Sequence, residues 1–276
     1  MTPDGFRYFG GIDFSGAKEP LSNLWTAVGV AAGERLRILS VRPHAYRVDM
    51  AGYVANGWRA IEPDSENASI LWGADFPFGL PTEVARVLGA GTSWARQVAW
   101  VADRPANEIR DAAGETARLP RLTDAGGALA PLDLRLYKQT TEGLRWIHEL
   151  RESHDDPVAL LPHQPDERAR TALIEVYPSA TVRDLGLPRR RAPGRPGEIR
   201  ARVAALRPYL DFADRDAEAT AATLEDAWDA TVACLTAFLC RDDLDQPLRL
   251  NPDQAERVKM EGWIYRCPAA VAGTGR

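Results

Sequence analysis

Acidic residues stand directly after apolar segments at several points of this chain, and this feature constrains the fold more than any other. Asp13 and Asp75 each follow a run of mainly apolar residues, and so does Glu175. A carboxylate at the end of a buried strand needs a partner or a metal ion, because an uncompensated buried charge is unfavourable. If several of these acids converge on one point, divalent cations would explain all of them together.

Two further acids, Asp226 and Asp229, lie three residues apart in a long alanine-rich stretch. On a helix, residues at i and i+3 project from the same face. The neighbouring Ala230, Ala233 and Ala237 are small enough to let such a helix approach a sheet closely. We therefore expect both aspartates to face the strand ends.

The composition is that of an ordinary globular protein. The chain has 276 residues, of which 45% are hydrophobic and 26% charged, so one domain over residues 1–276 can bury a large core. There is no apolar run of eighteen residues, and the first residues lack the pattern of a signal peptide. We expect a soluble, cytoplasmic protein that does not bind membranes; its oligomeric state is left open.

The cysteines and histidines do not predict a zinc site. Three cysteines and four histidines are present, and none has the spacing of a ligand pair. Carboxylate oxygens instead favour hard cations, so Mg²⁺ or Mn²⁺ is the expected cofactor.

The order of expected elements indicates an α/β protein. The expected strands and helices cover residues 7–14, 24–31, 34–42 (strands), 49–60 (helix), 69–75 (strand), 171–177 (strand) and 216–241 (helix). This is the order of the ribonuclease H-like fold, with a mixed five-stranded sheet in the order 3-2-1-4-5 and a helical insertion at about residues 90–165. In that fold the first and fourth strands are adjacent and parallel, and Asp13 and Asp75 fall at their carboxyl ends, where open α/β sheets bind ligands.

Four short motifs add a resemblance to a known family. They are Gly11-Ile12-Asp13-Phe14-Ser15-Gly16, Asp75-Phe76-Pro77-Phe78-Gly79, Glu175-Val176-Tyr177-Pro178 and Asp226-Ala227-Trp228-Asp229-Ala230. In this order they resemble a family of predicted ribonuclease H-like nucleases filed as domain of unknown function 429. The last motif also resembles that of RuvC-type Holliday-junction resolvases. Enzymes of this superfamily usually carry glutamate at the fourth-strand position, where this chain has the shorter Asp75.

The resemblance implies a metal-dependent nuclease that hydrolyses phosphodiester bonds in DNA or RNA by a two-metal-ion mechanism. The implied catalytic residues are Asp13, Asp75 and Asp229. Lys18, close to the first of them in the chain, is a further catalytic candidate that could orient a phosphate or the attacking water. The expected metal ligands are these three aspartates with Asp226 and Glu175.

Several residues are candidates for binding the nucleic acid. Eight arginines against two acids lie between Arg183 and Arg207, and Arg189, Arg190, Arg191 and Arg195 could contact phosphates. A solvated loop broken by prolines and glycines explains this segment equally well. Ser15 and Lys138 are further candidates, since lysine is rare in this arginine-rich chain. The net charge of −5 argues against a protein that coats nucleic acid nonspecifically.

Each acid also has a structural alternative. Asp13 and Asp75 could accept backbone hydrogen bonds in turns, Asp226 could be a solvated helix residue, and Glu175 could pair with an arginine such as Arg183. Two other functions are also open. One is an ATP-dependent phosphotransferase of the actin-like branch, and the other is a non-catalytic binding module on the same fold.

Overall fold

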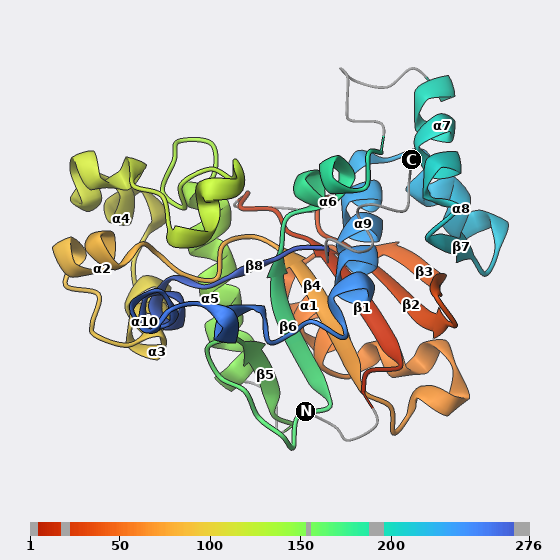
Figure 1. Ribbon diagram of the computed structural model, residues 1–276, viewed down its shortest axis with the longest axis horizontal. Helices are drawn as coiled ribbons and strands as arrows, with labels where there is room; N and C mark the ends of the chain where they lie inside the picture. The colour runs from red at the N-terminus through yellow and green to blue at the C-terminus, as the bar shows by residue number, and fades with distance from the viewer. Residues whose placement is uncertain (1–4, 18–22, 153–155, 188–195, 268–276) are drawn as a thin grey trace.

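A mixed β-sheet with helices on both faces forms the centre of the protein (Figure 1). The computed structural model describes residues 5–17, 23–152, 156–187 and 196–267. The strands are β1 (Tyr8–Asp13), β2 (Trp25–Ala32), β3 (Arg35–Pro43), β4 (Ile70–Asp75), β5 (Val158–Leu161), β6 (Thr171–Val176), β7 (Leu210–Phe212) and β8 (Ile264–Tyr265).

Helices fill most of the remaining described chain. The α-helices are α1 (Arg47–Ala55), α2 (Thr82–Leu88), α3 (Trp94–Ala102), α4 (Ala106–Ala113), α5 (Tyr137–Glu152), α6 (Pro178–Asp184), α7 (Pro196–Leu206), α8 (Arg215–Ala221), α9 (Glu225–Cys240) and α10 (Pro252–Glu261). Short 3₁₀ helices are η1 (Gly57–Ile61), η2 (Pro63–Ser65), η3 (Gly114–Arg118), η4 (Leu122–Gly126) and η5 (Gln246–Arg249).

The sheet has eight strands in the order β5-β6-β4-β1-β2-β3-β7, with β8 paired to β6. β1 is antiparallel to β2 and β2 to β3, whereas β1–β4, β4–β6 and β5–β6 are parallel. This order differs from the five-stranded order expected from the sequence. The fifth strand along the chain, β5, lies at an edge beyond β6. β5, β7 and β8 contain only two to four residues, too few to produce a recognisable pattern.

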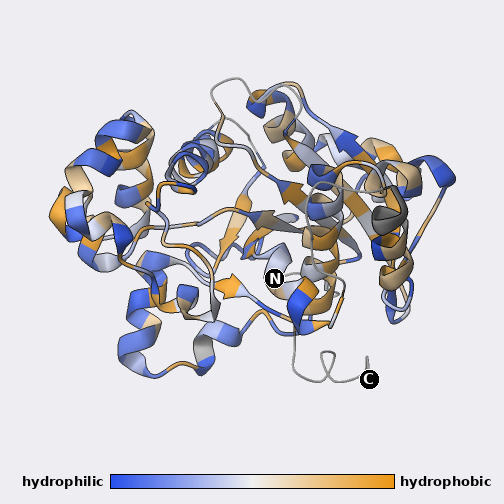
Figure 2. Ribbon diagram, turned by 90° about the horizontal axis from the view of Figure 1, so that it is seen from above, coloured by the Kyte–Doolittle hydropathy of each residue, from blue (hydrophilic) through white to orange (hydrophobic). Residues whose placement is uncertain are grey.

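The central strands bury residues on both faces, because alternate side chains point to opposite sides. Tyr8 and Ile12 of β1 belong to one hydrophobic cluster, and Phe9 belongs to the other. Figure 2 shows hydrophobic residues on the central strands and mainly hydrophilic ones on the outlying helices. The sheet is therefore the middle layer between two cores.

The alanine-rich segment forms two helices rather than the single helix expected over residues 216–241. α8 ends at Ala221 and α9 begins at Glu225, after Leu224 in an extended conformation. The β-branched Thr220 near the end of α8 and Thr223 within the break weaken helix propensity here. Asp226 consequently lies in the first turn of a new helix.

The segment between β4 and β5 contains α2 to α5, beside the sheet and next to α10 on the left of Figure 1. In the described part of the chain, no helix is both long and apolar enough to cross a membrane.

Candidate acidic site at the ends of β1 and β4

Asp13 and Asp75 are the last residues of two adjacent parallel strands and lie directly opposite each other. The register pairs Gly11 with Gly73, Ile12 with Ala74 and Asp13 with Asp75. Adjacent strands are about 4.8 Å apart, and residues at equivalent positions of a parallel pair point to the same face. The two carboxylates are therefore neighbours, and both are partly exposed.

Helix α9 covers the face of the sheet to which these aspartates point. A Cβ atom on Gly11 would lie 2.0 Å from the Ala230 carbonyl oxygen, and one on Gly73 would lie 2.6 Å from that of Ala233. Only glycine allows the helix backbone to approach the two strands this closely. Because Gly11 and Gly73 precede Asp13 and Asp75 by two residues, each glycine shares its face with the aspartate of its strand.

The direction of α9 brings its own acids to the same end of the sheet. Phe238 packs edge-on against Phe9 at the start of β1, with ring centroids 5.2 Å apart, whereas Ala230 lies over Gly11 further along the strand. Four helix residues rise about 6.0 Å and two strand residues about 6.6 Å, so the two steps nearly match. Asp226 is one turn before Ala230 and is thus brought toward Asp13. Asp229 is one turn before Ala233 and is brought toward Asp75.

The electrostatics of the site reflect this gathering of negative charge. Burial raises the pKa of the Asp13 carboxyl well above its usual range, and the charges of Asp75, Asp229 and Asp226 raise that pKa further. Burial also raises the pKa of Asp75 well above its usual range, with added effects of Asp229 and Glu175. In the described part of the chain, no hydrogen bond or ion pair to either of the two strand-end carboxylates compensates this repulsion.

Among the described residues, no three His, Cys, Asp or Glu side chains form a group that could hold a metal ion as they stand. The donor set nevertheless suits a hard cation, because it consists of carboxylate oxygens that repel one another. Coordination would require the aspartate side chains to converge from their present positions.

The loop after β1 packs against the start of α5. A Cβ atom on Gly16 would lie 2.3 Å from the Gln139 backbone nitrogen, so the loop and the helix are in close contact. The Gln139 amide donates to the Asp75 carbonyl oxygen at 2.6 Å and thereby holds the end of β4. These two contacts position both aspartate-bearing strand ends against one helix.

Ser15 belongs to the loop after β1, and Lys138 belongs to the first turn of α5, the two segments that meet at Gly16. The Ser15 hydroxyl oxygen accepts from the Ala17 amide at 3.2 Å, and its carbonyl oxygen accepts from Arg47 at 3.0 Å. Lys138 is exposed and lines a pocket of about 320 Å³ together with Gly16 and Arg47. Ser15 is thus two residues from Asp13 in the chain, and Lys138 lies beside Gly16 of the same loop; their role in substrate binding stays a prediction.

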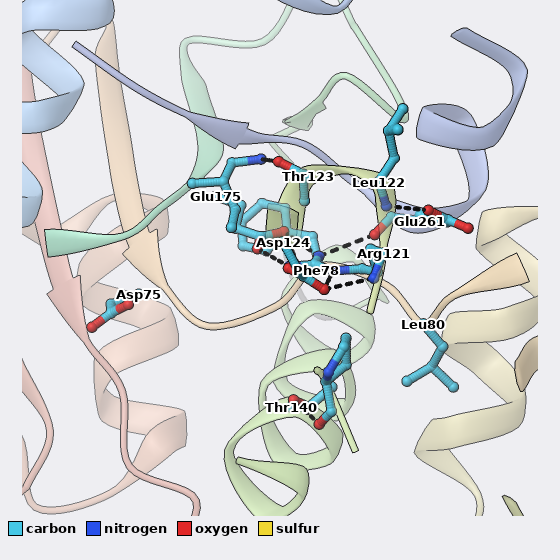
Figure 3. Close-up of polar contacts among 12 residues, drawn as sticks. Asp75, Phe78, Leu80, Arg121, Leu122, Thr123, Asp124, Thr140, Glu175 and Glu261 are labelled. Atoms are coloured by element: carbon cyan, nitrogen blue, oxygen red, sulfur yellow. Dashed lines mark hydrogen bonds and ion pairs between the residues drawn. The ribbon is translucent and has the colours of Figure 1, made fainter. Parts of the chain in front are cut away.

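Glu175 is engaged in a buried ion-pair network rather than facing the other acids. Arg121 donates to both of its carboxylate oxygens, at 2.7 and 2.5 Å, and the Phe78 amide donates to one of them at 2.9 Å. In Figure 3 Asp75 stands apart from this network, and no dashed line joins the two. The expected role of Glu175 as a metal ligand has no support in these contacts, and its partner is Arg121, not Arg183.

The network extends to two more acids. Arg121 also pairs with Asp124 at 2.9 Å and donates to the Glu261 carbonyl oxygen at 3.0 Å. The Glu261 carboxylate accepts from the Leu122 amide at 2.8 Å. Arg121 therefore ties together η4, β6 and the end of α10 behind the acidic site.

A pocket of about 150 Å³ lies between the acidic site and this network. Asp75 stands on one side, Arg121 and Glu175 on another, and Leu129, Leu136 and Tyr177 are among its remaining walls. Asp75, a candidate catalytic residue, therefore lines this pocket directly.

The sequence of this chain matches the model of a family described as a protein of unknown function (DUF429), over residues 11–256. The chain belongs to this family. The matched region contains Asp13, Asp75, Glu175, Asp226 and Asp229. No curated protein and no solved structure matches the chain.

Some predicted residues fall outside the description. Lys18 and the four arginines of the proline-rich loop, Arg189, Arg190, Arg191 and Arg195, lie outside the described residues. Conversely, sequence reasoning missed Arg121 and Gln139. An arginine in an arginine-rich chain and a glutamine within a helix carry no local pattern, so only the tertiary contacts identify them.

Proposed function

We propose that this member of the DUF429 family is a Mg²⁺- or Mn²⁺-dependent nuclease with a ribonuclease H-like catalytic sheet. The observation that carries the proposal is the direct opposition of Asp13 and Asp75 at the ends of two adjacent parallel strands. The carboxyl ends of such strands are where open α/β sheets bind ligands. The antiparallel β1–β2–β3 unit next to the parallel β4 supports the ribonuclease H-like assignment.

The donor chemistry supports a divalent cation. Asp13 and Asp75 would hold it, with Asp229 reaching from α9 and Asp226 beside Asp13. When bound, such ions supply an activated water and neutralise the oxyanion that departs from a phosphodiester. Cation binding requires ionised carboxylates, so the raised pKa values of Asp13 and Asp75 predict tighter binding as the pH rises.

The surrounding residues would position these groups. Gln139 fixes the end of β4 through the Asp75 carbonyl, and the close contact at Gly16 fixes the loop after Asp13. The exposed ammonium group of Lys138, adjacent to that loop, would attract a substrate phosphate.

The test is a panel of single strands, hairpins, RNA–DNA hybrids and four-way junctions incubated with the protein and Mn²⁺. We expect cleavage of at least one substrate, lost by at least about 100-fold in Asp13→Asn and in Asp229→Asn, because positioning and charge neutralisation fail together. The double variant should be little worse than either single one. Asp226→Asn should lose less.

Asp242→Asn is a matched control, since Asp242 lies just beyond the far end of α9 with a side chain 84% exposed. It should retain full activity. Hydrolysis of ATP with no cleavage of any nucleic acid would instead favour the phosphotransferase alternative, and binding without hydrolysis the non-catalytic module.

A further inference from the structure

We infer that the 150 Å³ pocket beside Asp75 receives one unpaired nucleobase of the substrate, an inference that rests on the proposed nuclease function. The substrate would then be a strand with at least one base outside a duplex. The charge of the pocket, its size and lining, and its place next to the acidic site all favour a base.

The charge of the lining excludes a phosphate. The guanidinium group of Arg121 has five N–H donors. They are directed to the Asp124 and Glu175 carboxylates and to the Glu261 carbonyl oxygen, and each nitrogen reaches at least one of these acceptors within 3.3 Å. Arg121 is therefore already saturated. With Glu175 and Asp75 also in the lining, the charged groups of the pocket sum to a negative charge. A phosphate would be repelled, whereas a neutral heterocycle would not.

The size and the lining of the pocket suit a ring. A cavity of about 150 Å³ with apolar walls is large enough for benzene. Here Leu129, Leu136 and Ile264 supply apolar surface, and the ring of the partly exposed Tyr177 supplies an aromatic one. Bases stack on aromatic side chains whatever their sequence, so such a pocket would hold a base without selecting one.

The position of the pocket links it to the reaction. Asp75 belongs both to the pair at the strand ends and to the pocket lining. A nucleotide whose phosphate lies at Asp13 and Asp75 would have its base beside this opening. A base held in a duplex cannot leave its stack without losing stacking and pairing energy, so unpaired nucleotides are favoured.

The experiment measures binding in Mn²⁺ by the full chain carrying Asp229→Asn, in which Asp13 and Asp75 remain to hold the ion while cleavage is too slow to interfere. The probes are a short single-stranded oligonucleotide and a second one of equal length and charge that lacks bases. Ala128→Trp fills the pocket from a loop position that is only partly buried. Leu134→Trp is the control, because Leu134 is 70% exposed, lies six residues further along the same segment and does not line the pocket.

We expect Ala128→Trp to weaken binding of the base-containing strand by about 5-fold to about 100-fold, the range for loss of one stacked base. Binding of the base-free strand should stay unchanged, as should both affinities in Leu134→Trp. Fluorescence of a 2-aminopurine base on binding to the natural chain gives a second readout that needs no variant. A change in that signal is expected if the base enters the pocket.

The outcomes separate the two proposals. In one outcome, the protein cuts or binds nucleic acid but shows equal affinity for both strands and no effect of Ala128→Trp. This result overturns the base pocket and leaves the nuclease proposal intact. Failure to bind or cut any nucleic acid overturns both.

Discussion

Replacing Asp13 by asparagine should make the metal-free protein more stable while removing its response to Mg²⁺ or Mn²⁺. Asparagine keeps the size of the side chain but removes one of the negative charges that face each other at the ends of β1 and β4. Two unit charges about 5 Å apart repel by about 3 kcal/mol at the effective dielectric near a protein surface. Both carboxylates are partly exposed, so solvent screening lowers the gain to about 1–2 kcal/mol.

The pH dependence follows from the raised pKa of Asp13. An aspartate has an unfolded-state pKa of about 3.9, and a higher folded-state pKa means that the folded protein binds the proton more tightly. The natural protein therefore loses stability as the pH rises from about 4 through the raised pKa of Asp13. The advantage of Asp13→Asn should be small near pH 4.5 and fully developed above the raised pKa.

The assay is thermal unfolding in EDTA at a series of pH values from 4.5 upward. For a domain of this size the gain corresponds to an increase in Tm of about 2–8 °C at the higher pH values. Asp242→Asn removes an exposed charge at the other end of α9 and should change stability by less than about 0.5 kcal/mol. Equal stability of Asp13→Asn and the natural chain at every pH of the series would refute the repulsion on which this reasoning depends.

Three further predictions use the same measurements. Millimolar Mg²⁺ or Mn²⁺ should raise the Tm of the natural chain by mass action but not that of Asp13→Asn, and calorimetry that detects no binding of either ion would contradict the metal site. Gly11→Ala should destabilise the protein by about 3 kcal/mol or more in urea unfolding, because the added Cβ would overlap the backbone of α9 at Ala230. The control Gly52→Ala, at an open position of α1, should stabilise the protein by about 0.5–1 kcal/mol. Arg121→Met should lower the free energy of unfolding by about 3–5 kcal/mol, since it leaves the Glu175 carboxylate buried without its cation; a loss below about 1 kcal/mol would show that the network is not important for stability.

The sequence by itself determined the strand-end position of Asp13 and Asp75 and the helical setting of Asp229. These are local properties: a run of apolar residues that ends in an acid, or an aspartate among alanines, can be read from neighbours along the chain. The central strands and the α/β class follow from the same patterns. Short strands such as β5 and β7 do not, because three or four residues at the edge of a sheet form no periodic signal.

Only the tertiary structure decided which acids lie together. Glu175 follows a run of apolar residues just as Asp75 does, yet Arg121, 54 residues earlier in the chain, engages both of its oxygens. The approach of α9 to β1 depends on the absence of a side chain at Gly11, more than 200 residues before Ala230. Such pairings depend on the packing of distant segments, and a partner at that distance leaves no pattern in the sequence around either residue.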